Sequence, residues 1–170
     1  MDWYPVGWVK SAHGIKGEIY VQLFSKKAEW LAELKTFQLK INDGSEQVFL
    51  IKRVKSHKEG LILLPEGFNN RNQSEQWKKA EFLIPKDILI SDDASKPFLV
   101  EVEGFEVRDS TIGVIGPIIG FQDNGAHDLL IVEKNGNSYL IPFVDAFIQE
   151  INKEEKWILM NLPDGLFDEN

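Results

Sequence analysis

The chain has 170 residues, of which 43% are hydrophobic and 27% charged, and its formal net charge is -8. This length fits one large β-domain or two small ones, and the apolar share suffices for a packed core. The sequence holds no cysteine, no basic-then-apolar leader and no apolar run of about 20 residues, which excludes disulfides and thiolate sites and indicates a cytoplasmic protein without a membrane span.

A glycine loop between two strands is the clearest pattern of the first half. We expect strands over residues 4–9 and 18–24, the second because apolar and polar side chains alternate along it. Between them, the run HGIKG from His13 to Gly17 places two glycines three residues apart, as a tight turn requires. The loop offers backbone N–H groups, an imidazole and an ammonium but no nucleophile, so it predicts binding and not catalysis.

The rest of the first half predicts a small closed barrel. Further strands are expected over residues 37–41, 48–54, 61–64 and 82–84, with turns at Asp43-Gly44 and at residues 58–60. A short helix is expected over residues 26–34. A second helix is expected to be capped by Asn69 or Asn70 and to continue through residues 74–80, with Trp77 inward. Barrel closure would remove the exposed strand edges.

The periodic pattern breaks between Pro85 and Pro97. The polar run SDDASK inside this interval predicts a linker over residues 86–97, between a first domain over residues 1–85 and a second over residues 98–170. The two halves differ in charge. Residues 1–85 hold 13 basic and 10 acidic side chains, a net of +3, and residues 86–170 hold 6 and 17, a net of -11. This asymmetry favours an anionic partner for one half and a cationic partner for the other, although acidic surfaces also serve solubility alone.

The second half predicts a second small barrel with strong turn chemistry. A strand is expected over residues 104–107, and the glycines within residues 112–121 predict bends or bulges. Asn135-Gly136, between two apolar runs, predicts a type I′ hairpin. A short helical turn over residues 143–148, a last strand over residues 157–160 and a terminal turn over residues 162–166 that packs back complete the prediction.

Several of these stretches resemble a known family, the ribosome maturation factor RimM. AHGIKGEIYV and FNNRNQSEQWKKAEFLI are similar to its first domain, a barrel like those of translation factors, and GAHDLLIVEKNGNSYLIPFVDAFIQEIN with LPDGL is similar to its second, a PRC-barrel. The resemblance implies a non-enzymatic assembly factor of the small (30S) ribosomal subunit. Such a factor binds the maturing head, meaning the 3′ domain of 16S rRNA and the head protein numbered nineteen, and aids 16S rRNA processing. It implies no cofactor and no membrane, and we expect a monomer.

The resemblance and the charges together single out residues for rRNA or ribosome contact. His13, Gly14, Lys16 and Gly17 match the family's loop, and phosphate contact competes there with a purely structural turn. Lysines and an arginine elsewhere in the first domain are candidates for a basic face: Lys26, Lys27, Lys52, Arg53, Lys55, Lys78 and Lys79. Arg71 is a further candidate, with a structural pairing to Glu75 as the equal alternative.

Apolar residues of the second domain are the candidates for contact with a protein partner. They are Phe98, Leu99, Phe143, Val144 and Phe147, and simple core filling is the competing interpretation for each. Family members usually carry two adjacent aromatic residues at the position of Phe98 and Leu99, so this chain keeps one of the two. We expect at least one of this pair to be exposed.

No metal site or catalytic constellation is predicted. His57 and His127 are expected to be structural or merely exposed, because three histidines this far apart in sequence have no metal spacing. Two alternatives to the assembly factor remain open: a general RNA-binding, translation-factor-like module whose second barrel dimerises, and a small hydrolase or metal-dependent enzyme on a β-barrel, whose deep pocket of convergent ionisable groups the sequence does not indicate.

Overall fold

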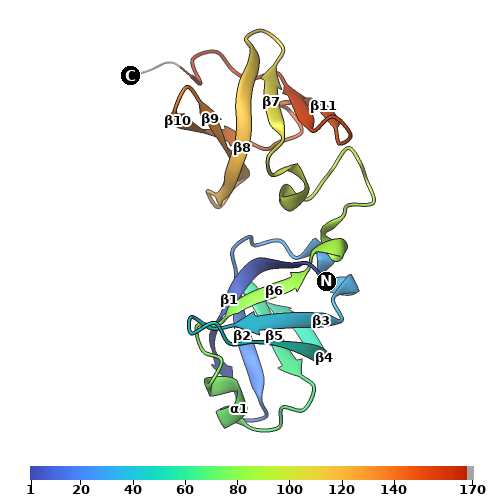
Figure 1. Cartoon of the computed structure of the whole chain (residues 1–170), viewed down its shortest axis with the longest axis vertical. Helices are drawn as coiled ribbons and strands as arrows, with labels where there is room; N and C mark the ends of the chain where they lie inside the picture. The colour runs from blue at the N-terminus through green and yellow to red at the C-terminus, as the bar shows by residue number, and fades with distance from the viewer. Residues whose placement is uncertain (168–170) are drawn as a thin grey trace. The chain divides into compact units, whose positions relative to one another are not determined.

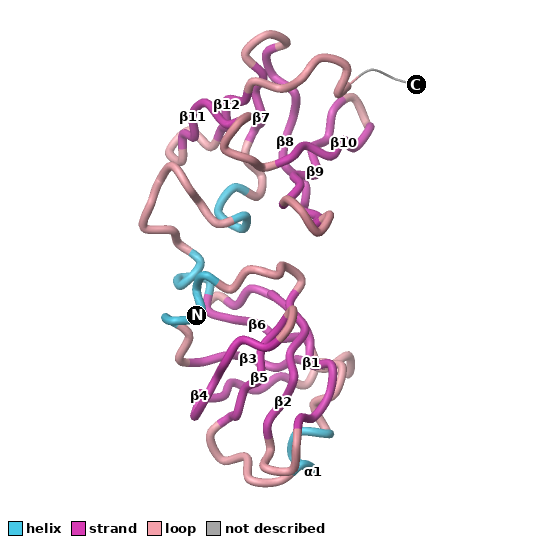
Figure 2. Tube along the Cα trace, turned by 180° about the vertical axis from the view of Figure 1, so that it is seen from behind, coloured by secondary structure: helices cyan, strands magenta, loops and turns pink. Residues whose placement is uncertain are grey.

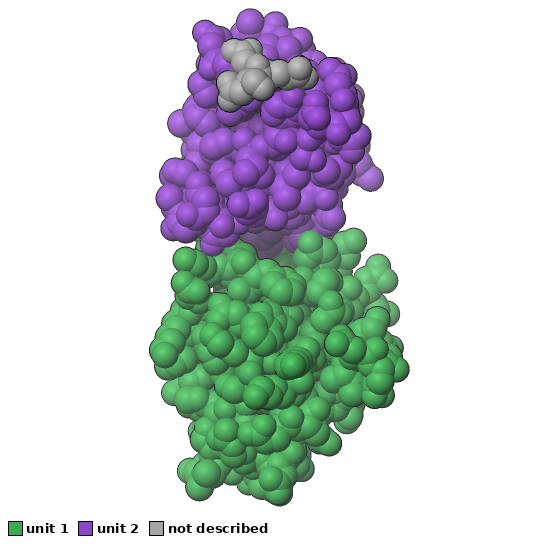
Figure 3. Space-filling view, turned by 90° about the vertical axis from the view of Figure 1, so that its left-hand side faces the viewer, with its two compact units in different colours: residues 1–89 green, residues 90–170 purple. Residues whose placement is uncertain are grey.

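The computed structural model describes residues 1–167, and the chain folds into two compact units, residues 1–89 and residues 90–170 (Figure 1 and Figure 3). Strands and loops make up nearly all of the described chain, which holds only four short helical segments (Figure 2). The predicted all-β fold with a few short helices is therefore confirmed.

The first unit is a closed barrel with the strand order β1-β2-β5-β4-β3-β6. Its strands are β1 (Trp3–His13), β2 (Glu18–Leu23), β3 (Thr36–Lys40), β4 (Glu46–His57), β5 (Gly60–Pro65) and β6 (Glu81–Pro85). The neighbouring strands are antiparallel, and β1 closes the barrel by pairing with β6, where Trp3 lies opposite Pro85. The turns predicted before β4 and before β5 are both present.

Alternation along β2 and β5 separates the barrel interior from its outer face. Ile19 and Val21 of β2 pair in register with Leu63 and Leu61 of β5, and all four side chains are fully buried in the interior. The residues between them therefore point outward, because successive side chains of a strand face opposite sides. This parity determines which polar side chains of β2 and β4 meet on the outer face.

The two predicted helices of the first unit are shorter than expected. The region around residues 26–34 forms only a 3-10 turn, η1 (Glu29–Glu33), which suits a short connection between two strands. The second helix, α1 (Arg71–Glu75), begins directly after the predicted cap Asn70 but ends at Glu75 and does not continue to residue 80. It ends because the backbone N–H of Trp77 turns back to the Ser74 carbonyl and Lys79 adopts a φ of 71°, which an α-helix cannot accommodate. Trp77 is buried, as predicted.

The second unit is a six-stranded sheet with the order β10-β9-β8-β7-β12-β11. Two short 3-10 segments precede its strands: η2 (Lys86–Leu89), which belongs to the first unit, and η3 (Leu99–Val102). The strands are β7 (Glu106–Asp109), β8 (Gly113–Asp123), β9 (Asp128–Lys134), β10 (Asn137–Pro142), β11 (Ile148–Asn152) and β12 (Trp157–Met160). Its core gathers fully buried side chains from several strands, among them Val107, Leu130, Val132, Ile158 and Met160.

Turn chemistry in the second unit follows the sequence closely. Asn135 and Gly136 have φ values of 52° and 81°, the left-handed pair of a type I′ hairpin, so that prediction is confirmed. The predicted bulges of β8 are also present, as register shifts where it pairs with β7 and with β9. Gly116 lies so close to the Glu133 carbonyl that a Cβ atom there would collide with it.

Three details of the second unit differ from the prediction or were missed. Residues 143–148 form one hydrogen-bonded turn, with the Phe147 N–H on the Val144 carbonyl at 3.0 Å, and Ile148 already begins β11, a strand that was not predicted. The strand expected from residue 104 begins at Glu106. The parallel pairing of β12 with β7 was also not foreseen, because local patterns do not report long-range partners. Leu162 and Leu166 pack against the core, as expected of the terminal turn.

The polar segment before η3 is held by one carboxylate. Glu101 Oε2 accepts hydrogen bonds from the backbone N–H groups of Phe98 at 2.7 Å and Ser91 at 3.0 Å, while its Oε1 pairs with the Lys153 ammonium at 2.9 Å. The Ser91 hydroxyl in turn lies within hydrogen-bond distance of the Lys96 carbonyl at 2.8 Å and the Asp93 carbonyl at 3.0 Å, which share its one proton. The segment predicted as a linker thus has a defined hydrogen-bonded conformation.

Candidate nucleic-acid interface

The HGIKG loop joins β1 to β2 and is seated on the first unit by its second glycine. Gly17 has a φ of 95°, and a Cβ atom at this position would lie 2.8 Å from Cβ of Phe68. Gly14 also has a positive φ, 63°, but nothing lies within 4 Å of its added Cβ. Both glycines thus provide the positive φ that the turn requires. Only Gly17 also leaves room for the loop to pack on the segment that leads into α1.

Arg71 connects the loop to α1. Its Nη1 donates a hydrogen bond to the Gly14 carbonyl at 3.0 Å, and its Nε pairs with Oε1 of Glu75 at 2.9 Å. A capping box fixes the start of the helix, since the Asn70 side chain accepts from the Gln73 N–H and the Gln73 side chain accepts from the Asn70 N–H. The structural pairing of Arg71 is therefore present, and it also holds the loop backbone in place.

Aromatic packing beneath the loop gives it a rigid base. Phe68, against which Gly17 lies, makes an edge-to-face contact with Phe49 at 5.4 Å between ring centroids. Phe49 makes the same kind of contact with Trp77 at 5.4 Å and stacks on Phe37 at 5.3 Å. Such ring pairs each stabilise a fold by about 0.5–1.5 kcal/mol beyond area burial. The loop is thus supported by the core of the barrel.

We expect Gly17→Ala to lower the stability of the first unit by about 2 kcal/mol, because the new methyl group meets Phe68 and the residue must hold a left-handed conformation. Gly14→Ala is the matched control, since it carries the conformational cost of about 1 kcal/mol without the collision. Urea unfolding followed by tryptophan fluorescence measures both. Equal losses for the two variants would show that the contact with Phe68 does not matter.

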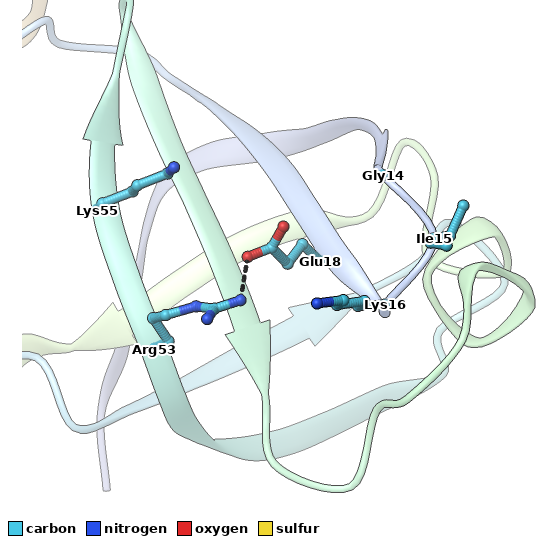
Figure 4. A pocket seen from close by; sticks show the side chains of 6 residues that line it. All are labelled: Gly14, Ile15, Lys16, Glu18, Arg53 and Lys55. Atoms are coloured by element: carbon cyan, nitrogen blue, oxygen red, sulfur yellow. Dashed lines mark hydrogen bonds and ion pairs between the residues drawn. The ribbon is translucent and has the colours of Figure 1, made fainter.

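A basic pocket lies beside the loop on the outer face of the barrel. It has a volume of about 470 Å³ and is lined by Gly14, Ile15, Lys16, Glu18, Arg53 and Lys55. Figure 4 shows Arg53 and Lys55 reaching from β4 toward Glu18 of β2, while the Lys16 ammonium points into the same space from the loop. Arg53 Nη2 pairs with Glu18 Oε1 at 2.7 Å. Three cations and one carboxylate therefore line the pocket, which suits a bound anion.

Strand pairing explains how these side chains meet. Arg53 and Lys55 lie opposite Leu64 and Ile62 of β5, on the outer side of the barrel. Those two apolar residues are only 7% and 3% exposed. Long basic side chains commonly cover apolar surface with their methylene stems while the charged ends reach solvent. Arg53 and Lys55 thus lie beside buried apolar residues of β5 and present their positive charge outward.

The structure brings only some of the predicted basic residues to this pocket. Lys16 and Gly14 line it, and His13 and Gly17 flank it at the ends of the loop. Lys26 and Lys27 follow the far end of β2, about 17 Å of extended strand from Glu18, and Lys26 pairs with Glu59 at 3.1 Å. Three further exposed lysines lie outside the pocket lining: Lys52, Lys78 and Lys79. Glu18 was missed because its partner Arg53 is 35 residues away in the sequence.

The apolar candidates of the second unit do not form an exposed patch. Phe98, Leu99, Phe143, Val144 and Phe147 are all half-buried, and of these Leu99, Phe143 and Phe147 pack against the core of the unit. Neither member of the Phe98/Leu99 pair is exposed, so that expectation is wrong. The strongly exposed large apolar side chains of this unit are others, namely Ile90, Ile112, Val114, Ile119 and Leu140.

Asp109 is a buried carboxylate of the second unit with a structural role. Its Oδ1 accepts from the N–H groups of Thr111 at 2.8 Å and Ile112 at 2.9 Å, and its Oδ2 accepts from Leu162 N–H at 2.9 Å. Burial raises the pKa of Asp109, but these three backbone hydrogen bonds outweigh burial, so its pKa lies below the usual range. The carboxylate ties the turn after β7 to the chain segment after β12.

Among residues 1–167, no cluster of three or more His, Asp or Glu side chains is placed to hold a metal ion. His13 and His57 do approach each other, with 6.0 Å between ring centroids, although they are 44 residues apart in sequence. The same described stretch of chain holds no helix long and apolar enough to cross a bilayer.

Comparisons with known proteins show which family the sequence matches. Residues 4–89 match the model of the RimM N-terminal domain, and residues 99–166 match that of the RimM PRC barrel domain. The ribosome maturation factor RimM of Bdellovibrio bacteriovorus is 39% identical over 165 residues, which cover 96% of this chain and 93% of that protein. RimM of an Arthrobacter species is 33% identical over 93% of this chain and 80% of its own length. Among solved structures, RimM of Pseudomonas aeruginosa covers 95% of this chain and 98% of its own, with 21% identity and a TM-score of 0.47.

Proposed function

The chain belongs to the RimM family of ribosome maturation factors, and from this premise we propose that it is a non-enzymatic assembly factor that binds the maturing head of the small ribosomal subunit. A role in ribosome maturation follows from the family. The proposal adds the 3′ domain of 16S rRNA and the head protein numbered nineteen as binding partners, support of 16S rRNA processing as the outcome, and the cytoplasm as the place of action.

The basic pocket beside the HGIKG loop is the observation that carries the rRNA part of the proposal. Lys16, Arg53 and Lys55 surround one carboxylate, Glu18, so the pocket keeps a net charge of +2. Cationic side chains this close together attract RNA phosphates, and their binding releases the counterions of those phosphates. The loop also presents the exposed backbone of Gly14, and backbone N–H groups are common phosphate contacts.

The charge of the second unit supports a cationic protein partner. Residues 90–170 hold 5 basic and 16 acidic side chains, a net of -11, whereas residues 1–89 hold 14 and 11, a net of +3. Proteins that pack within rRNA are rich in lysine and arginine, because they neutralise phosphates. An acidic surface attracts such a protein and repels RNA. The two units would therefore divide RNA and protein recognition between them.

The mechanism needs no bond to be made or broken. A factor that binds an immature arrangement of the head more tightly than the finished one stabilises that arrangement while assembly continues. Completion of the head then weakens binding and releases the factor. Differential affinity for two states is the whole requirement, and a tenfold preference corresponds to about 1.4 kcal/mol.

Co-sedimentation of the purified full-length chain with small subunits tests the proposal. We expect retention on particles isolated before head completion, and at least about tenfold weaker retention on mature subunits. The two particle types are compared at one moderate salt concentration, because RNA binding depends steeply on salt. Equal retention on both, together with equal binding to unrelated RNA, would contradict the assembly role and favour a general RNA-binding module.

A further inference from the structure

Three aromatic rings from distant parts of the chain meet on the outer face of the first barrel. The imidazole of His57, the last residue of β4, lies edge-on to the Tyr20 ring at 5.7 Å between centroids. It also lies 6.0 Å from the His13 ring at the end of β1. All three side chains are half-buried, so each ring keeps solvent-accessible surface. We call Tyr20, His57 and His13 the ring cluster.

The ring cluster continues the basic pocket along the same strands. Arg53, Lys55 and His57 alternate along β4, so their side chains share the outer face. Tyr20 and Lys55 both lie opposite Ile62 of β5, one on each side of it. The cluster therefore begins in the same cross-strand row as Lys55, one of the cations that line the pocket.

Two contacts hold the Tyr20 ring in place. Gly60 lies under it, since a Cβ atom on Gly60 would be 3.1 Å from Cε2 of the ring. The ammonium of Lys10, which is exposed, lies 5.8 Å from the ring centroid, within cation–π distance. A ring that is oriented before binding loses little conformational entropy when a ligand stacks on it.

Covering Ile62 is the simplest role for these rings, and it leaves their chemistry unexplained. Ile62 is 3% exposed, and any apolar side chain of sufficient size on β2 would bury it. Here the cover consists of flat rings with a cation near the face of one of them, and Lys55 and Arg53 lie beside the rings on the same outer face. Sites for single-stranded RNA combine these same features, a basic groove for the backbone and aromatic rings on which bases stack.

We propose that the ring cluster is a stacking site for an unpaired RNA base whose adjacent phosphates lie against the basic pocket of Lys16, Arg53 and Lys55. This inference rests on the proposed RNA-binding function and specifies its ligand. Bases inside a duplex are stacked on one another and do not present their flat faces, so the ligand is a single-stranded loop, bulge or end. Ile15, which is 77% exposed at the tip of the loop, provides a further apolar contact for ribose or base.

Fluorescence anisotropy with two labelled oligomers tests the proposal on the full-length chain. One is a hexamer of adenosine ribonucleotides and the other is an abasic ribose-phosphate hexamer with the same charge. We expect the chain to bind the adenosine hexamer about tenfold more tightly than the abasic one, because stacking on an aromatic side chain typically has an effect of this size or larger. Measurements at several salt concentrations should give the same slope for both oligomers, because stacking releases no counterions.

Substitutions at Tyr20 separate stacking from apolar cover. Tyr20→Leu still covers Ile62 but removes the central ring of the cluster and leaves only the two imidazoles, so it should lose most of the preference for the adenosine hexamer. Tyr20→Phe keeps the ring and should retain the preference for adenosine. Thermal unfolding of both variants checks that the barrel is intact.

The outcomes separate this inference from the proposed function. Equal binding of both oligomers by the unchanged chain, or an unaltered preference in Tyr20→Leu, would overturn the stacking site while leaving phosphate binding in place. Failure of both oligomers to bind, together with undiminished retention of the chain on immature subunits, would overturn the stacking site and assign the ribosome contact to protein. Failure in both assays would overturn the proposed function itself.

Discussion

Replacement of Asp109 by asparagine is expected to destabilise the second unit by about 2–3 kcal/mol. The carboxylate satisfies three backbone N–H groups and is 4% exposed, so water cannot replace a lost acceptor. An asparagine amide can keep the oxygen that serves Thr111 and Ile112. Its NH₂ group would then face the Leu162 N–H, which leaves two donors opposed and releases the segment after β12.

Hydrogen exchange of the full-length chain, followed by mass spectrometry, measures this effect unit by unit. Peptides from residues 90–167 should lose protection in Asp109→Asn, and peptides from the first unit should not. Asp123→Asn is the matched control, because that carboxylate accepts only one backbone hydrogen bond that the structure assigns, from Gly125 at 2.7 Å. A loss of protection as large in the control as in Asp109→Asn would refute the role assigned to Asp109.

The same residue predicts a pH dependence with a definite sign. The folded-state pKa of Asp109 is lowered, so its contribution to stability is fully present above the unfolded-state value of about 3.9 and is lost as pH falls through the lower folded-state value. Asp109→Asn lacks this contribution at every pH. The difference in stability between the two proteins should therefore be constant near neutrality and shrink in acid. A difference that grew on acidification would contradict the assignment.

Reversal of two charges in the basic pocket is expected to have the largest effect on RNA binding. Lys16→Glu/Lys55→Glu changes the net charge of the pocket from +2 to -2 and leaves the Glu18–Arg53 pair intact. We expect binding to a 16S rRNA 3′-domain transcript to weaken about a hundredfold at low salt. The slope of log affinity against log salt should fall by about 2, one for each lost phosphate contact.

Lys35→Glu/Lys40→Glu is the charge-matched control for this experiment. Both lysines are exposed, lie at or beside β3 and do not line the pocket, yet the substitution changes the total charge of the chain by the same amount. A local site predicts a far smaller effect for the control. Similar losses in the two double variants would mean that overall charge, and not the pocket, drives RNA binding.

Structural features that depend on residues close together in the sequence were predicted correctly, and features that depend on distant residues were not. Hairpin turns such as Asn135-Gly136 depend on two adjacent residues, and these predictions are confirmed. The helix predicted from a cap at Asn69 or Asn70 through residue 80 starts as predicted but is too long, because its end depends on Trp77 and Lys79 turning back onto the barrel, which is a tertiary effect. Local patterns also missed β11, which contains polar residues at positions where a buried strand would have apolar ones.

The candidate site likewise contains one part that the sequence predicts and other parts that only the fold brings together. The HGIKG loop is a contiguous motif and could be recognised directly. The pocket needs Glu18 and Arg53 to meet across three strands, and the ring cluster needs His13, Tyr20 and His57 to converge, which only the barrel register brings about. Half-burial of Phe98 and Leu99 likewise depends on tertiary packing, so the expectation that at least one of them is exposed was wrong.

The parallel pairing of β7 with β12 sets the order in which the two units can fold during synthesis. Trp157 pairs with Glu106 across 51 residues, so β7 and β12 cannot pair until the chain has been synthesised beyond Trp157. The first barrel closes with β6 and is complete as soon as Pro85 has emerged. Non-local strand pairing also slows folding itself. The first unit, which carries the basic pocket, would therefore be native while its acidic neighbour is still a nascent chain.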